Sequence, residues 1–289
     1  MKKQTKWIVL FLLPGLAVFT FVFLSSLIML VGTSFTDWAI GKDMNFTGLK
    51  NYIYLITQDE NFIQSVKNTI IWIVLQSIIH VALGVTVALV LARKKWYSNI
   101  MRVVYFIPNV ISSAALGILF LCIMNAQFGL VNNAISKLTG EVFSQNWFMD
   151  PKTAFFTVTM TWLPYAGLVT ILVMAEMSSI SEEIYEAAMI DGATQLQIDF
   201  QIVLPLMRNI IGTSTVLAAT SMLQKLDIIM MTTSGGPGNK TMNLPMYLYK
   251  TVFTYNNYGL ANAQGVLLII LGVVALVLIR KIYRMDEKE

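Results

Sequence analysis

The chain has 289 residues, of which 56% are hydrophobic and only 12% are charged, with a formal net charge of +4. Soluble globular domains carry roughly 25% charged residues, so this composition excludes a soluble protein and indicates one embedded in a lipid bilayer. The cationic excess forms no basic patch with interleaved aromatic residues, so no nucleic-acid partner is expected.

Six apolar runs along the chain are each long enough to cross a bilayer core of about 30 Å as a helix. They predict an all-α, polytopic fold with a single transmembrane domain over residues 1–289. The first run is too long for the apolar region of a secretory signal and is expected to be retained as a span. The predicted spans are residues 7–31, 66–92, 103–124, 153–175, 209–231 and 260–282.

Lysine and arginine predict the orientation of these spans, because cytoplasmic loops of membrane proteins are enriched in both residues. The compact cluster Arg93–Lys95 follows the second span, and further cations lie near both ends of the chain. We therefore expect both the N and C termini in the cytoplasm. The same distribution of lysine and arginine places the loop 176–208 on the cytoplasmic side.

Two isolated residues in the early spans carry little chemistry. Cys122 is the single cysteine, so it forms no internal disulfide. His80 is the single histidine and lies within the second span. Histidine ligands of metals occur in groups, so we expect His80 to pack or to form a helix–helix hydrogen bond.

The loop 176–208 is predicted to contain two short helices. Ser181 is a plausible N-cap for the first, and Glu182 and Glu183 place negative charge in its first turn. Gly192 follows where a helix end favours a residue without Cβ. A second short helix, 195–203, precedes a Leu-Pro pair. Taken alone, this pattern is also compatible with an ordinary amphipathic loop helix.

The fifth predicted span carries its polar residues on one side. A charge at mid-membrane costs roughly 2.5–3.5 kcal/mol, so Lys225 and Asp227 should face a cavity or a partner. Amides, hydroxyls and an aromatic ring suit a sugar, and Trp162 and Tyr165 lie beside Pro164 in the fourth span. Alternatively, the two charges lie near the outer end of the span and are solvated or paired with another subunit. The candidate solute-path residues are Trp162, Tyr165, Thr220, Ser221, Gln224, Lys225 and Asp227.

No catalytic or nucleotide site is visible in the sequence. The segment 235–241, GGPGNKT, lacks the glycine before lysine that a phosphate-binding loop requires. No nucleophile, histidine and acid form a set. We therefore expect a protein that is not an enzyme and that binds no cofactor itself.

Several motifs recur in order along the chain. The cytoplasmic loop reads E-A-A-x-x-D-G-A, followed by Leu-Pro. The other motifs are FTGLKNY at 46–52, SGGPGNKT at 234–241 and YGLANAQ at 258–264. Together they resemble the carbohydrate permeases of ABC importers related to the maltose, glycerol-3-phosphate and multiple-sugar systems, and the F-type maltose permease in particular. The matching loop positions are Glu186, Ala187, Ala188, Asp191, Gly192, Ala193, Leu204 and Pro205.

The resemblance implies a type I ABC importer fold in a bacterial cell membrane. It implies a heterodimer with a second homologous permease subunit, two cytoplasmic ABC ATPase subunits that bind ATP and Mg, and an extracytoplasmic solute-binding protein. In that family the E-A-A loop docks in a cleft of the ATPase, and the fourth and fifth spans line the path of the sugar. Leu226 departs from the family pattern, which often has an aromatic residue before this aspartate.

Three other functions remain open at this point. An ion-coupled secondary carrier would transport without ATP or a second subunit. A membrane scaffold or channel subunit would not depend on the cytoplasmic loop. An ABC importer of a peptide, amino acid or phosphate would share the loop but differ in cargo.

Overall fold

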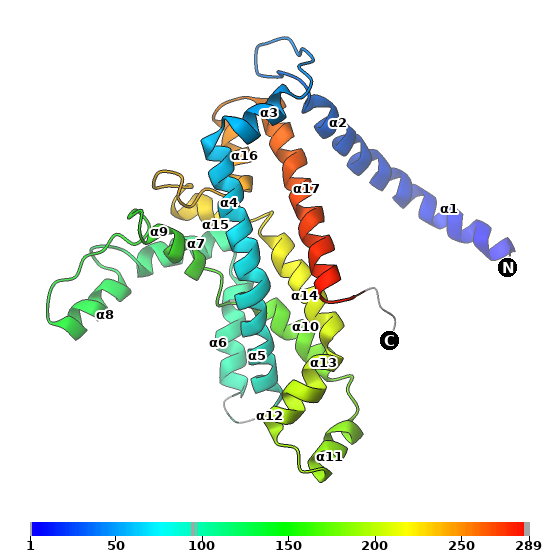
Figure 1. Ribbon diagram of the computed structural model, residues 1–289, viewed down its shortest axis with the longest axis vertical. Helices are drawn as coiled ribbons and strands as arrows, with labels where there is room; N and C mark the ends of the chain where they lie inside the picture. The colour runs from blue at the N-terminus through cyan, green and yellow to red at the C-terminus, as the bar shows by residue number, and fades with distance from the viewer. Residues whose placement is uncertain (1, 94–95, 97, 286–289) are drawn as a thin grey trace. The chain divides into compact units, whose positions relative to one another are not determined.

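The computed structural model describes residues 2–93, 96 and 98–285, and within these ranges the regular structure is helical, with isolated bridges and no strands (Figure 1). The chain divides into two units. The first contains residues 1–62 and 248–270, and the second contains residues 63–247 and 271–289.

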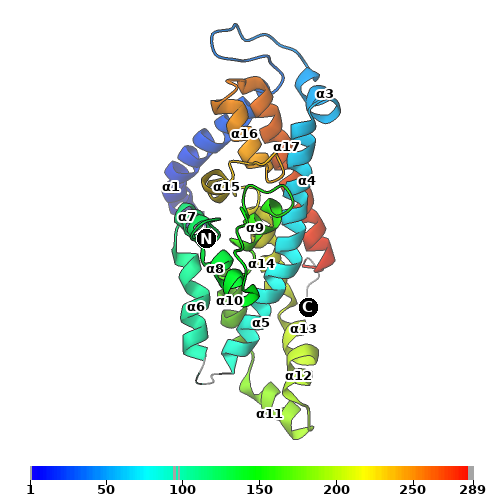
Figure 2. The ribbon, with the colours of Figure 1, turned by 90° about the vertical axis from the view of Figure 1, so that its left-hand side faces the viewer.

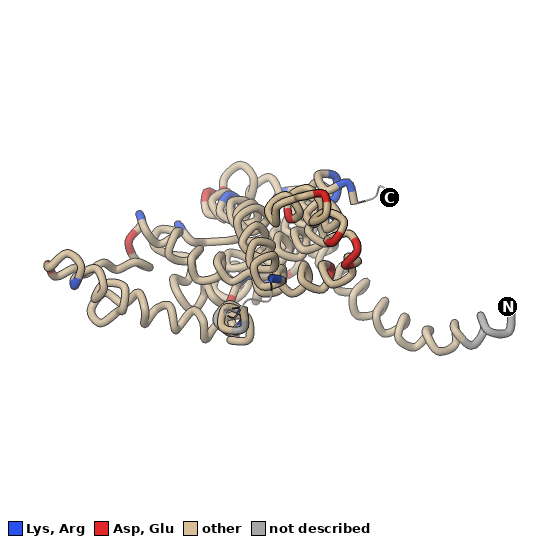
Figure 3. The backbone as a smooth tube through the Cα atoms, turned by 90° about the horizontal axis from the view of Figure 1, so that it is seen from below, with Lys and Arg blue, Asp and Glu red and all other residues tan. Residues whose placement is uncertain are grey.

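The first unit is built around an apolar helical run, Ile8–Thr33, of which no residue in its most apolar window is buried within the chain. Figure 3 shows no charged residue along it. Its end is fastened to the last long helix, because the Asn262 amide donates to the Thr33 hydroxyl at 2.6 Å. The helices of this unit are α1 (Lys2–Phe19), η1 (Thr20–Leu24), α2 (Ser25–Thr33), α3 (Lys50–Thr57), most of α16 (Leu244–Phe253) and the first part of α17 (Tyr258–Ile282).

The second unit contains the remaining helices. Up to the cytoplasmic loop these are α4 (Glu60–Leu75), η2 (Gln76–His80), α5 (Val81–Ala92), α6 (Ser98–Val110), α7 (Ser113–Ile123), α8 (Leu130–Thr139), α9 (Ala154–Met160) and α10 (Gly167–Met177). After it come α11 (Glu182–Ile190), α12 (Gln195–Ile198), η3 (Asp199–Val203), α13 (Leu204–Leu206), α14 (Arg208–Ser221) and α15 (Asp227–Thr232). Figure 2 shows α11 and α12 beyond the end of α5.

Three of the predicted spans are divided in the structure. The third becomes α6 and α7, which meet at a bend of 109° shortly after Pro108. Proline removes a backbone hydrogen bond and favours such a bend. The fourth breaks at residues 161–166 and the fifth at residues 222–226. Among the described residues three helices are long and apolar enough to span a bilayer, or up to five with bent pairs, so the six spans and the orientation of the termini stay predictions.

The core of the second unit lies where α5 crosses α10. A Cβ on Gly84 would lie 2.6 Å from the Cβ of Val169, so only glycine allows this approach. The Thr170 hydroxyl donates to the Gly84 carbonyl at 3.0 Å and joins the two helices directly. The same core includes Ala188 and Ile198 of the cytoplasmic loop. The loop is therefore packed onto the helices that it follows and precedes.

Candidate functional site

The cytoplasmic loop forms the predicted pair of short helices joined by a tight turn. Helix α11 ends at Ile190 with Asp191 as its C-cap, and Gly192 has a φ of +79°, a left-handed conformation that favours glycine. Thr194 then opens α12 with a capping box, in which its backbone N–H donates to the Gln197 side chain at 2.7 Å. Ser181 precedes α11 in the extended conformation of an N-cap but makes no side-chain capping bond.

This loop is anchored to the end of α5 by an ion pair. Arg93, the C-cap residue of α5, donates to the Asp199 carboxylate at 2.8 Å, and the Asp199 side chain is only 6% exposed. The Gln195 amide donates to the other Asp199 oxygen at 3.0 Å. Burial raises the pKa of the nearby Tyr185 phenol, and the Asp199 charge raises it further. The carboxylate thus joins η3 and α12 of the loop to the end of α5.

The residues predicted to contact an ATPase divide into two groups. Glu186, Ala187, Asp191, Gly192 and Pro205 are exposed. In contrast, Ala188 is buried, at 7% exposure, and Ala193 is half-buried. The small side chain of Ala188 therefore lets α11 pack closely on the core. The exposed side also carries large apolar side chains, namely Met189, Ile190, Leu196 and Phe200.

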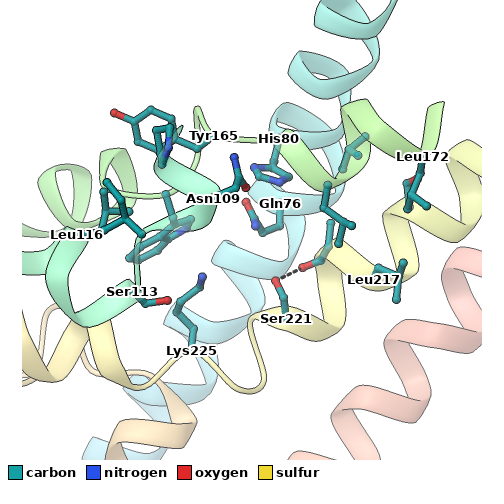
Figure 4. A pocket seen from close by; sticks show the side chains of 17 residues that line it. Gln76, His80, Asn109, Ser113, Leu116, Tyr165, Leu172, Leu217, Ser221 and Lys225 are labelled. Carbon is teal, nitrogen blue, oxygen red and sulfur yellow. Dashed lines mark hydrogen bonds between the residues drawn. The ribbon is translucent and has the colours of Figure 1, made fainter. Parts of the chain in front are cut away.

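A cavity of about 220 Å³ lies among the broken helices of the second unit (Figure 4). Four of the predicted solute-path residues line it, namely Trp162, Tyr165, Ser221 and Lys225. The other three do not. Gln224 and Asp227 are exposed elsewhere, and the Thr220 hydroxyl donates to the carbonyl of Val216 at 2.8 Å in its own helix. Polar lining residues absent from the predicted set are Gln76, His80, Asn109, Ser113 and Ser214.

A π-turn occurs in the second predicted span where Gln76 and His80 line this cavity. The run Glu60–Ala92 is a single apolar helical stretch that contains the π-helix Gln76–His80. A π-turn rotates the following side chains relative to regular α-helical spacing, and such turns are frequent at functional sites. No regular periodicity in the sequence signals it. The predicted hydrogen bond of His80 is confirmed, since its Nδ1 lies 2.9 Å from the Leu163 carbonyl oxygen.

The aromatic side chain of Trp162 at the cavity wall packs against neighbouring side chains. Trp162 meets Trp72 edge-on with ring centroids 5.2 Å apart, and the Trp72 indole N–H donates to Thr159 at 2.8 Å. The Lys225 ammonium lies over the Trp162 ring, 5.9 Å from its centroid, within the range of a cation–π interaction.

Lys225 faces the cavity because the fifth span is interrupted beside it. The backbone between α14 and α15 is not helical at Lys225, and its carbonyl accepts a hydrogen bond from the Asn243 amide at 2.6 Å. The stretch just before Asn243 is in turn bound to α4, since the Asn68 amide donates to the Met242 carbonyl at 2.7 Å. These bonds connect the segment just before α16 to the edge of the cavity.

Two polar atoms at the cavity wall have no partner within the described part of the chain. They are Oε1 of Gln76, a residue that is 4% exposed, and the hydroxyl of Ser214, a residue that is fully buried. Buried polar atoms in native proteins are nearly always hydrogen-bonded. Both atoms belong to residues that line the cavity, and both are themselves buried.

Comparison with known proteins identifies the class. Residues 80–284 match the family model described as "Binding-protein-dependent transport system inner membrane component". The chain is 30% identical to the probable ABC transporter permease protein YurN of Bacillus subtilis, over 97% of both chains. It is also 30% identical to the multiple sugar-binding transport system permease protein MsmF of Streptococcus mutans, over 86% of this chain and 85% of that one.

A solved structure shares the fold. A bacterial alginate ABC transporter in complex with an alginate pentasaccharide-bound periplasmic protein contains a chain with a TM-score of 0.84 and 20% identity, over 99% of this chain and 96% of that one. The chain belongs to the family of inner-membrane components of binding-protein-dependent transport systems. It is an ABC-importer permease, located in the membrane, and the ATPase is a separate subunit. The predicted class and its non-enzymatic role are thereby confirmed.

Proposed function

We propose that this permease moves a sugar or oligosaccharide inward by alternating access, driven by partner ATPases. The observation that carries the proposal is the exposed turn at Gly192, which is packed onto the core through Ala188 and joined to α5 through Asp199. A rigid, exposed turn of this kind can transmit a displacement to the membrane-spanning helices. ATP and Mg belong to the ATPases in this scheme, and this chain binds neither.

The partners in the proposal follow the family pattern. A second homologous permease completes a heterodimer, two ABC ATPases bind the cytoplasmic loops, and a solute-binding protein delivers cargo from outside. Support for a sugar comes from the cavity, which combines amides, hydroxyls and an indole ring. The name of the Streptococcus mutans relative also points to sugars.

The route of force runs from the loop to the cavity through two helices. Closure of the ATPases displaces α11 and α12, and Arg93 carries the movement to α5, whose chain continues directly into Gln76 and His80. Packing on Val173 carries it to α10, which follows Trp162 and Tyr165. The loaded partners must favour one of the two arrangements, since a ligand shifts an equilibrium only by differential binding.

The test uses the backbone conformation of Gly192. No atom lies within 4 Å of a Cβ built there, so a substitution acts through the positive φ and not through a clash. Left-handed backbone disfavours a β-branched residue by roughly 1–2 kcal/mol and is tolerated by asparagine. In proteoliposomes with all partners, Gly192→Val should abolish most ATP-dependent uptake, and Gly192→Asn should retain most of it.

Insertion and complex assembly of both variants are the controls. Equal uptake by Gly192→Val and the unmodified complex would refute the role of the turn in coupling.

A further inference from the structure

The charge of the cavity is unbalanced. Lys225 is the only lysine or arginine among the described residues that line it, and none of these residues is an aspartate or glutamate. No described carboxylate forms an ion pair with its ammonium. The charge of Asp227, two residues further on, acts on the Lys225 ammonium, but Asp227 forms no ion pair with it, is exposed and does not line the cavity. A half-buried cation with no ion-paired carboxylate favours an anionic ligand.

The position of the ammonium also bears on how a sugar would bind. The Lys225 ammonium lies over the Trp162 ring, and Trp162 is only 5% exposed. A neutral sugar that packs its C–H face there would have to displace the ammonium without offering it a charge. An anionic sugar provides a stronger, charge-assisted partner for Lys225. In Figure 4 the Lys225 side chain points into the space that Gln76 and Ser113 border.

The unpartnered atoms define the rest of the ligand. Oε1 of Gln76 only accepts hydrogen bonds, so its partner must be a donor such as a sugar hydroxyl. The Ser214 hydroxyl both donates and accepts. A solute with several hydroxyls and one anionic group satisfies all three side chains, whereas an inorganic anion leaves Gln76 without a donor.

We propose that the cargo is an anionic sugar, whose carboxylate, sulfonate or phosphate binds Lys225 while its hydroxyls bond Gln76 and Ser214. This inference rests on the proposed function and adds the charge of the substrate. It makes Lys225 the residue that determines specificity between acidic sugars and their neutral parents.

The test begins with the cognate solute-binding protein and a library of mono- and oligosaccharides in which each neutral sugar is matched by its C6 carboxylate, sulfonate and phosphate forms. Binding is measured by calorimetry, and sugars that bind are then offered, radiolabelled, to the complete complex in proteoliposomes with ATP. We expect at least one acidic form to bind and to be imported, and its neutral parent to be imported poorly or not at all. Comparison of the carboxylate, sulfonate and phosphate forms shows which anionic group is recognised.

The second step changes Lys225 itself. A hydrogen bond to a charged group contributes about 10- to 100-fold, so Lys225→Gln should lower uptake of the acidic sugar by that factor and affect a neutral parent much less. Lys225→Arg keeps the charge and should restore most of the uptake. Lys137→Gln removes an exposed lysine on α8 and serves as the matched control. ATP hydrolysis in the absence of sugar reports whether each variant complex is intact.

The outcomes separate this inference from the function on which it rests. Import of neutral sugars alone, or an acidic sugar whose uptake is the same in Lys225→Gln, would overturn the anionic cargo and leave sugar import standing. Binding of no sugar in the library would overturn both.

Discussion

At the scale of single residues, Asp199 is the carboxylate on which the cytoplasmic loop depends. Its side chain is 6% exposed, whereas that of Arg93 is 36% exposed. The two partners are therefore not equivalent. Loss of the arginine leaves a buried carboxylate without its cation, whereas loss of the carboxylate charge leaves an arginine that can turn toward water.

We expect Arg93→Met to lower the free energy of unfolding by about 2 kcal/mol and Asp199→Asn by less than about 1 kcal/mol. The double variant Arg93→Met/Asp199→Asn should be more stable than Arg93→Met alone, because it no longer buries an unpaired charge. Thermal unfolding of the purified protein in mild detergent measures all three. A larger loss in Asp199→Asn than in Arg93→Met would contradict this account of the pair.

Gln76 and Ser214 show a different property at the same scale. Each has a buried polar atom without a partner, although the neighbouring His80 and Ser221 are bonded to backbone carbonyls. Such atoms reduce stability unless a ligand or water bonds them. Both residues line the cavity, which agrees with its proposed role as a binding site.

At the scale of elements, the contact between α5 and α10 joins the cytoplasmic loop to the cavity. Gly84 permits this contact, because a Cβ there would lie 2.6 Å from one atom of Val169 and 3.1 Å from Ala166. The helices cannot separate without also breaking the bond from Thr170 to the Gly84 carbonyl.

Gly84→Ala should therefore lower the free energy of unfolding by about 1–3 kcal/mol through overpacking, despite the higher helix propensity of alanine. Gly32→Ala is the matched control, since no atom lies within 4 Å of a Cβ at that helical glycine. The melting temperatures of both variants in detergent provide the comparison. Indistinguishable melting temperatures would show that α5 and α10 can separate freely.

The broken helices are the second structural feature at the scale of elements. Residues 161–166 interrupt the fourth predicted span, and residues 222–226 interrupt the fifth. These breaks place Trp162 and Lys225 side by side at the cavity. Non-helical backbone at membrane depth is tolerated where it is enclosed by protein or lines a cavity, which agrees with their location.

At the scale of the whole molecule, this chain is the permease subunit of an ABC importer. The family assignment places the ATPase on another subunit. An ion-coupled carrier, by contrast, would contain its own coupling machinery. The two possibilities differ in what the isolated chain can do.

We expect the purified chain alone, in liposomes with a proton or sodium gradient, to accumulate no sugar above the level of empty liposomes. Addition of the second permease, the ATPases, the binding protein and ATP should produce accumulation. Gradient-driven uptake by the isolated chain would contradict the importer mechanism and favour a secondary carrier.

The sequence predicted the cytoplasmic loop well because its signals are local. First-turn acidic residues and a glycine act within a few positions of the chain, so Gly192 and the helices on either side of it appear where expected, although Ser181 makes no side-chain capping bond. Membrane insertion was likewise determined by composition and by the length of the apolar runs, because the bilayer acts on each run separately.

Only the tertiary structure decided which polar side chains share a cavity. Regular spacing places Gln224 and Asp227 with Lys225, but with the break before α15 neither lines the cavity, whereas Gln76 and His80, from a span more than 100 residues earlier, do. The burial of Ala188 has the same origin, in contacts with α5 and α10. Which side chains are buried or share a cavity depends on packing between distant segments. Helical periodicity within one segment does not contain that information.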